Sequence, residues 1–219
     1  DEVAMMAKIS GAVNTVHVVD GRFIGYNTDG RGLLEALEQE ARFTPDGRNV
    51  AIIGAGGAAG AAAVAFILGK AARLTVANRT MERVEELVER LAPHARATEI
   101  VPCELASASS AVSEADLVVN ATPVGMSAGD PSPVPPDWLH EGQIVCDMIY
   151  RPAVTPLLSA ARERGATALN GLGMLVAQGA ISIDIWSDSA QVTTPRDIML
   201  QAALEEMERL RYPDAGAES

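Results

Sequence analysis

Short apolar runs alternate with helical segments along most of the chain. Runs of four or five apolar residues predict buried strands at 50–53, 74–77, 117–120 and 144–148, with a weaker candidate at 98–101. Helical spacing and alanine-rich composition predict helices at 58–68, 81–91 and 154–163. Strands that alternate with helices in this way indicate an α/β fold with a right-handed, doubly wound parallel sheet. Such sheets bind ligands at the carboxyl ends of their strands.

The N-terminal region has a different pattern. Two strand-like runs, 12–19 and 22–26, are joined by Asp20-Gly21, a dipeptide suited to the tight turn of a β-hairpin. A helix is expected from Asp29 or Gly30 to about Arg42, with Thr28 or Asp29 at its N-cap. The chain is therefore expected to begin with a hairpin that leads, through one helix, into the parallel sheet.

A glycine-rich turn follows the strand at 50–53. It leads directly into an alanine-rich helix, as in dinucleotide-binding folds, and consists of Gly54, Ala55, Gly56, Gly57 and Ala58. Gly54 permits a tight turn, and Gly56 lets a pyrophosphate approach bare backbone at the helix N-terminus. The pattern predicts a Rossmann-type nucleotide-binding domain.

The end of the next strand indicates which nucleotide binds. NAD-binding proteins usually place an acidic residue there, against the ribose hydroxyls, whereas this chain has Asn78. Arg79, Thr80 and Arg83 add two guanidinium groups and a hydroxyl that can hold a 2′-phosphate. Taken singly, either arginine could equally be a solvated residue at the start of a helix. Together with the glycine turn, these residues favour NADP over NAD.

Charge and composition argue against several classes of partner. The chain has 17 basic and 29 acidic side chains, and its net charge of −12 argues against nucleic acid and anionic membranes. No apolar run approaches the roughly 20 residues of a membrane span, so a cytoplasmic location is the default expectation. Cys103 and Cys146 form no CxxC pair and the histidines are scattered without ligand spacing, so no metal site is expected.

Two further loops are predicted at the carboxyl edge of the sheet. Residues 120–126 leave their strand with small residues and a proline, as a loop beneath a flat ring would, although a simple strand exit fits equally well. Residues 170–186 lead glycines into an apolar helix that carries one amide, Gln178. Because a buried amide needs partners, Gln178 is expected either to cap backbone groups or to face a polar ligand.

Seven motifs together resemble those of the shikimate dehydrogenase family, in the family's order and approximate spacing. They are Gly11-Ala-Val-Asn-Thr-Val16, Gly25-Tyr-Asn-Thr-Asp-Gly30, the turn at 54–58, Asn78-Arg-Thr80 with Arg83, Asn120-Ala-Thr-Pro-Val-Gly-Met126, Asp147-Met-Ile-Tyr150 with Pro152 and Thr155-Pro156, and Asn170-Gly-Leu-Gly-Met-Leu-Val-Ala-Gln178. The resemblance covers nearly the whole chain. It implies the reversible NADPH-dependent reduction of 3-dehydroshikimate to shikimate, in the pathway toward aromatic amino acids.

The resemblance also implies roles for individual residues. Substrate would be bound by Asn14, Asp29, Tyr150 and Gln178. Asp29 would in addition be one half of the catalytic pair, although without the resemblance it is better interpreted as an N-cap. The turn at 54–58 would hold the pyrophosphate. The ribose phosphate end would be held by Asn78, Arg79, Thr80 and Arg83, and the nicotinamide end by Met148 and Gly171.

The other half of the catalytic pair has no counterpart here. The family takes it from a lysine in a preceding N-terminal stretch, whereas the two lysines of this chain, Lys8 and Lys70, lie in no matching context. We therefore expect a remnant of an α/β substrate domain at 1–30, an NADP-binding domain with its connecting helix at 31–188, a C-terminal helical segment at 189–212 and a disordered tail at 213–219. If physically this short, the protein is expected to bind NADP but to turn over shikimate poorly.

Two other functions stay open at this level. A quinate/shikimate dehydrogenase would often prefer NAD and carry an acidic residue near Asn78 or Thr80, which this chain lacks. A non-catalytic NADP-binding module would explain the missing lysine but not the substrate-contact residues that are present. The sequence is compatible with a homodimer and does not fix the oligomeric state.

Overall fold

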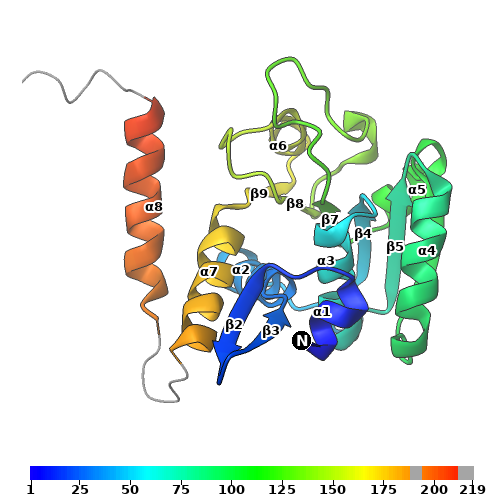
Figure 1. The fold of residues 1–219 in the computed structure, drawn as a ribbon. Coiled ribbons are helices and arrows are strands. Elements are labelled where there is room, and N and C mark those ends of the chain that lie inside the picture. Colours follow the sequence, from blue (N-terminus) through cyan, green and yellow to red (C-terminus); the bar gives the residue numbers. More distant parts are fainter. Residues whose placement is uncertain (188–193, 212–219) are drawn as a thin grey trace, which may run out of the picture.

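The computed structural model describes residues 1–187 and 194–211, which form two separate sheets (Figure 1). The predicted tail at 213–219 and part of the predicted C-terminal segment lie outside the described residues. The N-terminal sheet has the order β1-β3-β2, with β1 at Glu2–Val3, β2 at Thr15–Val19 and β3 at Arg22–Tyr26. The larger sheet is six-stranded and parallel, with the order β6-β5-β4-β7-β8-β9.

The larger sheet confirms the predicted α/β fold. Its strands are β4 (Asn49–Ile53), β5 (Arg73–Asn78), β6 (Glu99–Glu104), β7 (Leu117–Asn120), β8 (Ile144–Asp147) and β9 (Thr167–Leu169). The chain runs outward from β4 to β6 and then returns to the other side of β4 to form β7. The crevice at the carboxyl ends of β4 and β7 is therefore the topological switch point, where ligands bind in doubly wound sheets.

Helices cover both faces of this sheet. The described helices are α1 (Met5–Ser10), α2 (Asp29–Ala41), α3 (Gly57–Leu68), α4 (Met81–Leu91), α5 (Ser109–Ser113), α6 (Pro156–Glu163), α7 (Leu172–Trp186) and α8 (Arg196–Arg211), with short 3-10 turns at Ala92–His94, Leu105–Ser107 and Pro136–Trp138. Helix α8 lies outside α7, away from the sheet (Figure 1). Alternate residues of β4 enter two cores: Val50 and Ile52 pack with α2, α3 and α4, and Ala51 and Ile53 pack with α5 and α6. Burial on both faces explains why this strand is a continuous apolar run.

The predicted elements agree closely with the structure, but several short elements were not predicted. Helix α4 has the predicted limits, whereas α6 begins at Pro156 instead of residue 154, because the Thr155 hydroxyl caps it by accepting from the Leu158 amide (3.3 Å). The sequence analysis did not identify β1, α1 or β9. These segments are too short for a periodic signal, and tertiary pairing defines them.

The hairpin is confirmed, with β2 beginning at Thr15 instead of residue 12. Asp20 and Gly21 have φ of 49° and 76°, as a type I′ turn requires at both central positions. The N-cap prediction for α2 was wrong for Asp29, which is the first helical residue. Thr28 occupies the N-cap position, but its side chain makes no capping bond; instead, Asn27 Oδ1 accepts from the Asp29 amide (3.0 Å). The side chains of Thr28 and Asp29 are therefore free for other contacts.

Glycines let α2 lie very close to its two neighbours, α3 and α7. A Cβ at Gly30 would come within 2.5 Å of the Ala61 carbonyl oxygen on α3. A Cβ at Gly32 would lie 2.7 Å from the backbone nitrogen of Gln178 on α7. This close packing places the N-terminal end of α2, with Asp29, beside Gln178.

Within the described ranges, no helix is long and apolar enough to cross a membrane, and no group of three or more acidic, histidine or cysteine side chains could hold a metal ion. Among the residues that the structure describes, the N-terminal sheet and the six-stranded sheet share no hydrogen-bonded strand. The proposed domain boundary after residue 30 stays a prediction.

Candidate functional site

The glycine turn lies at the switch point of the six-stranded sheet. Gly54 has φ of 123°, and a Cβ there would lie 2.9 Å from the Ala121 carbonyl oxygen at the end of β7. Gly56 is the N-cap of α3, and a Cβ on it would meet no protein atom within 4 Å. The turn is therefore tight on its protein side and open on the other, where the N-terminal amides of α3 can face an anion.

A cavity of about 590 Å³ extends from this turn. Its lining includes three residues of the turn and three from the end of β5 and the start of α4: Gly54, Ala55, Gly56, Asn78, Arg79 and Arg83. Both arginines are exposed, and neither makes an ion pair within residues 1–187 and 194–211. The cavity therefore combines a backbone anion site with two unpaired cations.

Thr80 is the one residue of the group predicted to hold the ribose phosphate end that does not line the cavity. Its carbonyl oxygen accepts from Asn78 Nδ2 (3.1 Å). The amide of Asn78 thus fixes the turn between β5 and α4 from which Arg79 projects. Any contact between the Thr80 hydroxyl and a ligand stays a prediction.

A second cavity, of about 560 Å³, continues along the same edge of the sheet. The two cavities share Ala121, Thr122 and Pro123 of the loop after β7. Ala58, Met148 and Tyr150 also line the second cavity. This cavity therefore extends from the start of α3 to the loop after β8. Gly171 lies directly behind this loop, because a Cβ there would overlap the Met148 carbonyl oxygen. Gly57, the first residue of α3, lies in the sequence between Gly56, which lines the first cavity, and Ala58, which lines the second.

A separate cluster of polar side chains forms where the hairpin meets α2 and α7. Asn14 Nδ2 donates to Asp29 Oδ1 (2.7 Å) and lies 3.4 Å from Gln178 Oε1. Gln178 Nε2 donates to the Leu175 carbonyl (2.9 Å), so this amide both bonds to backbone and faces the cluster. Three residues far apart in the sequence thus present a carboxylate and two amides at one place.

Hydroxyl groups beneath this cluster hold it together. Buried Thr28 accepts from Asn14 Nδ2 (2.9 Å), and its own hydroxyl lies 3.3 Å from Gln178 Oε1 and 3.2 Å from Ser182 Oγ. Thr15 donates to Asn14 Oδ1 (2.9 Å) and lies 2.7 Å from Ser182 Oγ. The sequence analysis missed Thr15 and Ser182. Ser182 lies four residues after Gln178, on the same face of α7, and this spacing was the available signal.

Burial raises the pKa of Asp29 above its usual value, and the hydrogen bond from Asn14 opposes this shift. Desolvation disfavours the charged carboxylate, whereas a donor favours it. Asp29 is therefore easier to protonate than an ordinary surface aspartate. A carboxyl group of this kind is suited to exchanging a proton with a bound hydroxyl or carbonyl oxygen.

The polar cluster lies next to the glycine turn. A Cβ on Gly57, at the start of α3, would be 3.0 Å from the Cβ of Ala12, and Asn27 Nδ2 donates to the Ala12 carbonyl (3.1 Å). The segments that carry Asn14 and Asp29 therefore adjoin the N-terminal end of α3. Tyr150 is exposed in the lining of the second cavity, and no hydrogen bond joins it to the cluster in the described chain.

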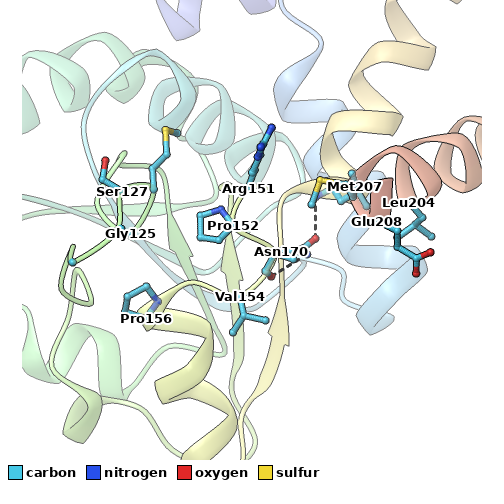
Figure 2. Close-up of a pocket in the computed structure, with 15 residues that line it drawn as sticks. Gly125, Ser127, Arg151, Pro152, Val154, Pro156, Asn170, Leu204, Met207 and Glu208 are labelled. Atoms are coloured by element: carbon cyan, nitrogen blue, oxygen red, sulfur yellow. Dashed lines mark hydrogen bonds between the residues drawn. The ribbon is translucent and has the colours of Figure 1, made fainter. Parts of the chain in front are cut away.

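The largest of these cavities, about 790 Å³, lies elsewhere and includes none of the predicted site residues (Figure 2). It lies between the loops at 125–129 and 151–154 and the α8 side chains Leu204 and Met207. Asn170 fixes one wall by donating to the Ala153 carbonyl (3.2 Å) and accepting from the Leu172 amide (3.0 Å). Its lining is mostly apolar, and it offers no convergent set of reactive groups.

Neither lysine reaches the polar cluster through a hydrogen bond or an ion pair in the described part of the chain. Lys8 is exposed on α1, and Lys70 is exposed just after α3. The structure thus brings Asn14, Asp29 and Gln178 together without a neighbouring ammonium group from either residue.

Comparison with known proteins gives a consistent result. A family model described as shikimate / quinate 5-dehydrogenase matches residues 37–126. The shikimate dehydrogenase (NADP(+)) of Methanopyrus kandleri is 40% identical over 213 residues, covering 94% of this chain and 71% of that protein. A crystal structure of a shikimate dehydrogenase with NADP+ superposes with a TM-score of 0.83 at 36% identity, covering 94% of this chain and 71% of the other. The Thermus thermophilus enzyme, solved with NADP(H) and shikimate, gives 0.79 at 35% identity, with coverages of 94% and 72%.

Proposed function

The chain belongs to the shikimate dehydrogenase family, and on that premise we propose that it is an NADP-dependent oxidoreductase that interconverts 3-dehydroshikimate and shikimate. The observation that carries the proposal is the convergence of Asn14, Asp29 and Gln178 beside the N-terminal end of α3. A site for a polyhydroxylated ring thereby adjoins a nucleotide-binding turn. This is the arrangement that hydride transfer between a nicotinamide and a carbinol carbon requires.

The residues at the carboxyl edge of the sheet fit NADP. The open space at Gly56 and the N-terminal amides of α3 suit the pyrophosphate, and the unpaired guanidinium groups of Arg79 and Arg83 suit the 2′-phosphate. Met148 and Gly171 would lie at the nicotinamide end. When bound, the reduced cofactor supplies a hydride to the carbonyl carbon of the substrate.

Asn14 and Gln178 would hold the substrate hydroxyls, and Tyr150 would close the site from the second cavity. Asp29 would hold or release the proton at the reacting oxygen, because burial makes its carboxyl group easy to protonate and Asn14 fixes its orientation. Family members supply a lysine as its partner. We propose that neither Lys8 nor Lys70 takes that role.

We further propose that different parts of the chain bind the substrate and the cofactor. Residues 1–30, with the hairpin, would contribute to substrate binding. The six-stranded sheet and its helices within 31–188 would bind the cofactor, and α2 would connect the two parts. Because Asp29 is the first residue of α2, a movement of this helix would change the distance between the two binding regions.

The cofactor assignment is tested by titrating the protein with NADP+ and NAD+ by calorimetry. NADP+ is expected to bind more tightly, because only it carries the 2′-phosphate that Arg79 and Arg83 can hold. Replacing Arg79 with alanine is expected to remove most of that preference, roughly ten- to a hundredfold for a charge-assisted contact. The affinity of the Arg79→Ala variant for NAD+ should change little.

Arg162→Ala is the matched control. Like Arg79, Arg162 is exposed and makes no ion pair among the described residues, but it lies on α6, outside the lining of the nucleotide cavity. This variant should keep both affinities. Equal binding of the two nucleotides by the wild-type protein, or an unchanged preference in Arg79→Ala, would overturn the assignment.

A further inference from the structure

Asp147 is a fully buried carboxylate that the proposed function does not use. It ends β8 beside Asn120, its register partner at the end of β7. Its Oδ1 accepts from Asn120 Nδ2 (3.0 Å) and from the Ile149 amide (3.1 Å), and its Oδ2 accepts from the Thr155 hydroxyl (2.7 Å). Within residues 1–187 and 194–211, no lysine or arginine forms an ion pair with it.

The hydrogen bonds around Asp147 favour its ionised form. The Thr155 hydroxyl donates to Asp147 Oδ2, and its oxygen accepts from the Leu158 amide. The other two partners, the Asn120 Nδ2 amino group and the Ile149 backbone N–H, can only donate. Burial raises the pKa of Asp147 above its usual value, and the three hydrogen bonds oppose this shift. Two groups that can only donate and a hydroxyl that can also donate favour the carboxylate form of Asp147.

The position of this charge matters because it lies directly beneath the second cavity. Asp147 bonds to the amide of Ile149, and the cavity is lined by Met148, Ile149 and Tyr150 on one side. Its other partner, Asn120, also orients the loop on the opposite side, since Asn120 Oδ1 accepts from the Thr122 hydroxyl (2.7 Å). The carboxylate therefore lies between the two loops that would enclose the nicotinamide.

The two redox states of the cofactor differ in charge at this end. The nicotinamide ring is cationic in NADP+ and neutral in NADPH. A fixed negative charge in a region of low dielectric constant attracts the first and not the second. We propose that Asp147 selectively tightens the binding of the oxidised cofactor, and so shifts the equilibrium on the protein toward NADP+. This inference rests on the proposed function, because it takes the second cavity as the nicotinamide site.

The test is to measure the dissociation constants of NADP+ and NADPH for the wild type and for Asp147→Asn by calorimetry or fluorescence titration. The amide keeps the shape of the side chain and an oxygen that can accept from Asn120 and Ile149, but it removes the charge. With an effective dielectric constant of about 20 and a separation of about 8 to 16 Å between the charges, NADP+ is expected to lose affinity relative to NADPH by roughly five- to thirtyfold. A role in loop structure alone would weaken both forms equally.

Asp116→Asn is the matched control. The Asp116 carboxylate accepts from the Asn49 amide (2.9 Å) and the Arg48 guanidinium (3.1 Å) at the amino ends of β4 and β7, the edge of the sheet opposite the two cavities. Its removal should leave the ratio of the two dissociation constants unchanged. An equal change of the ratio in both aspartate variants would overturn the inference.

A second pair of variants covers the case in which Asp147→Asn fails to fold. Thr155→Val removes a donor that favours the charged form of Asp147, and it should move the ratio in the same direction but less, whereas Thr155→Ser should keep the wild-type ratio. Equal ratios in these two variants, or in wild type and folded Asp147→Asn, would refute the role of Asp147. Failure of the wild type to bind either form of the cofactor would instead refute the proposed function.

Discussion

Replacing Gly32 with alanine is expected to force α2 and α7 apart. The new Cβ would lie 2.7 Å from the backbone nitrogen of Gln178 and 2.9 Å from its Cα. These are main-chain atoms, so no change of rotamer can relieve the contact, and one of the two helices must shift. Inserting a methyl group into a packed interface costs about 1 to 3 kcal/mol. Alanine in place of glycine within a helix recovers about 1 kcal/mol of that cost.

Gly179→Ala separates the two contributions. Gly179 follows Gln178 on α7, and a Cβ there would meet only the flexible end of Met199, at 3.6 Å, which is ordinary van der Waals contact. This variant gains the same helix propensity without the clash. The difference between the two unfolding free energies therefore isolates the overpacking cost, which we expect to be about 1 to 3 kcal/mol.

The assay is reversible denaturant unfolding of both variants, followed by circular dichroism, with thermal unfolding as a second measure. For a chain of this size each kcal/mol corresponds to a shift of about 2 to 4 °C in Tm. Gln178 meets Asn14 and Thr28 across the same contact, so the KM for shikimate should rise in Gly32→Ala and not in Gly179→Ala. Equal stability of the two variants would show that the close approach of α2 and α7 does not constrain the site.

Two further predictions concern ionisable groups. Asp29→Asn should lower kcat by roughly 10² to 10⁴ without weakening NADP+ binding, and normal turnover would refute the proton role. Burial raises the pKa of Asp29, so its ionisation disfavours the folded state near pH 7. This cost is relieved as the pH falls toward 3.8, so the unfolding free energy of Asp29→Asn should gain less than that of wild type over the same fall in pH. Burial raises the pKa of the Cys146 thiol to about 12, whereas Cys103 is only half-buried. A thiol reagent at pH 8 should thus modify Cys103 in the native protein and Cys146 only after unfolding, and rapid modification of both would contradict this burial.

The sequence by itself determined the architecture of the nucleotide-binding part. Continuous apolar runs predicted β4, β5, β7 and β8, and the glycine turn predicted the approach to α3, because apolar composition and backbone freedom are local properties of a segment. The need for glycine in this turn is also local, since Gly54 adopts a φ of 123° that other residues rarely take. The hairpin turn at Asp20-Gly21 was predictable on the same grounds.

The tertiary structure alone decided how the polar residues combine. Thr28 could be expected to cap a helix, but it instead bonds to side chains from the hairpin and from α7, which begins more than a hundred residues later. Asn120 and Asp147 end adjacent strands, and only the sheet order makes them partners. A local pattern specifies the conformation of its own segment, whereas the environment of a carboxylate depends on which distant donors the fold brings within hydrogen-bonding distance.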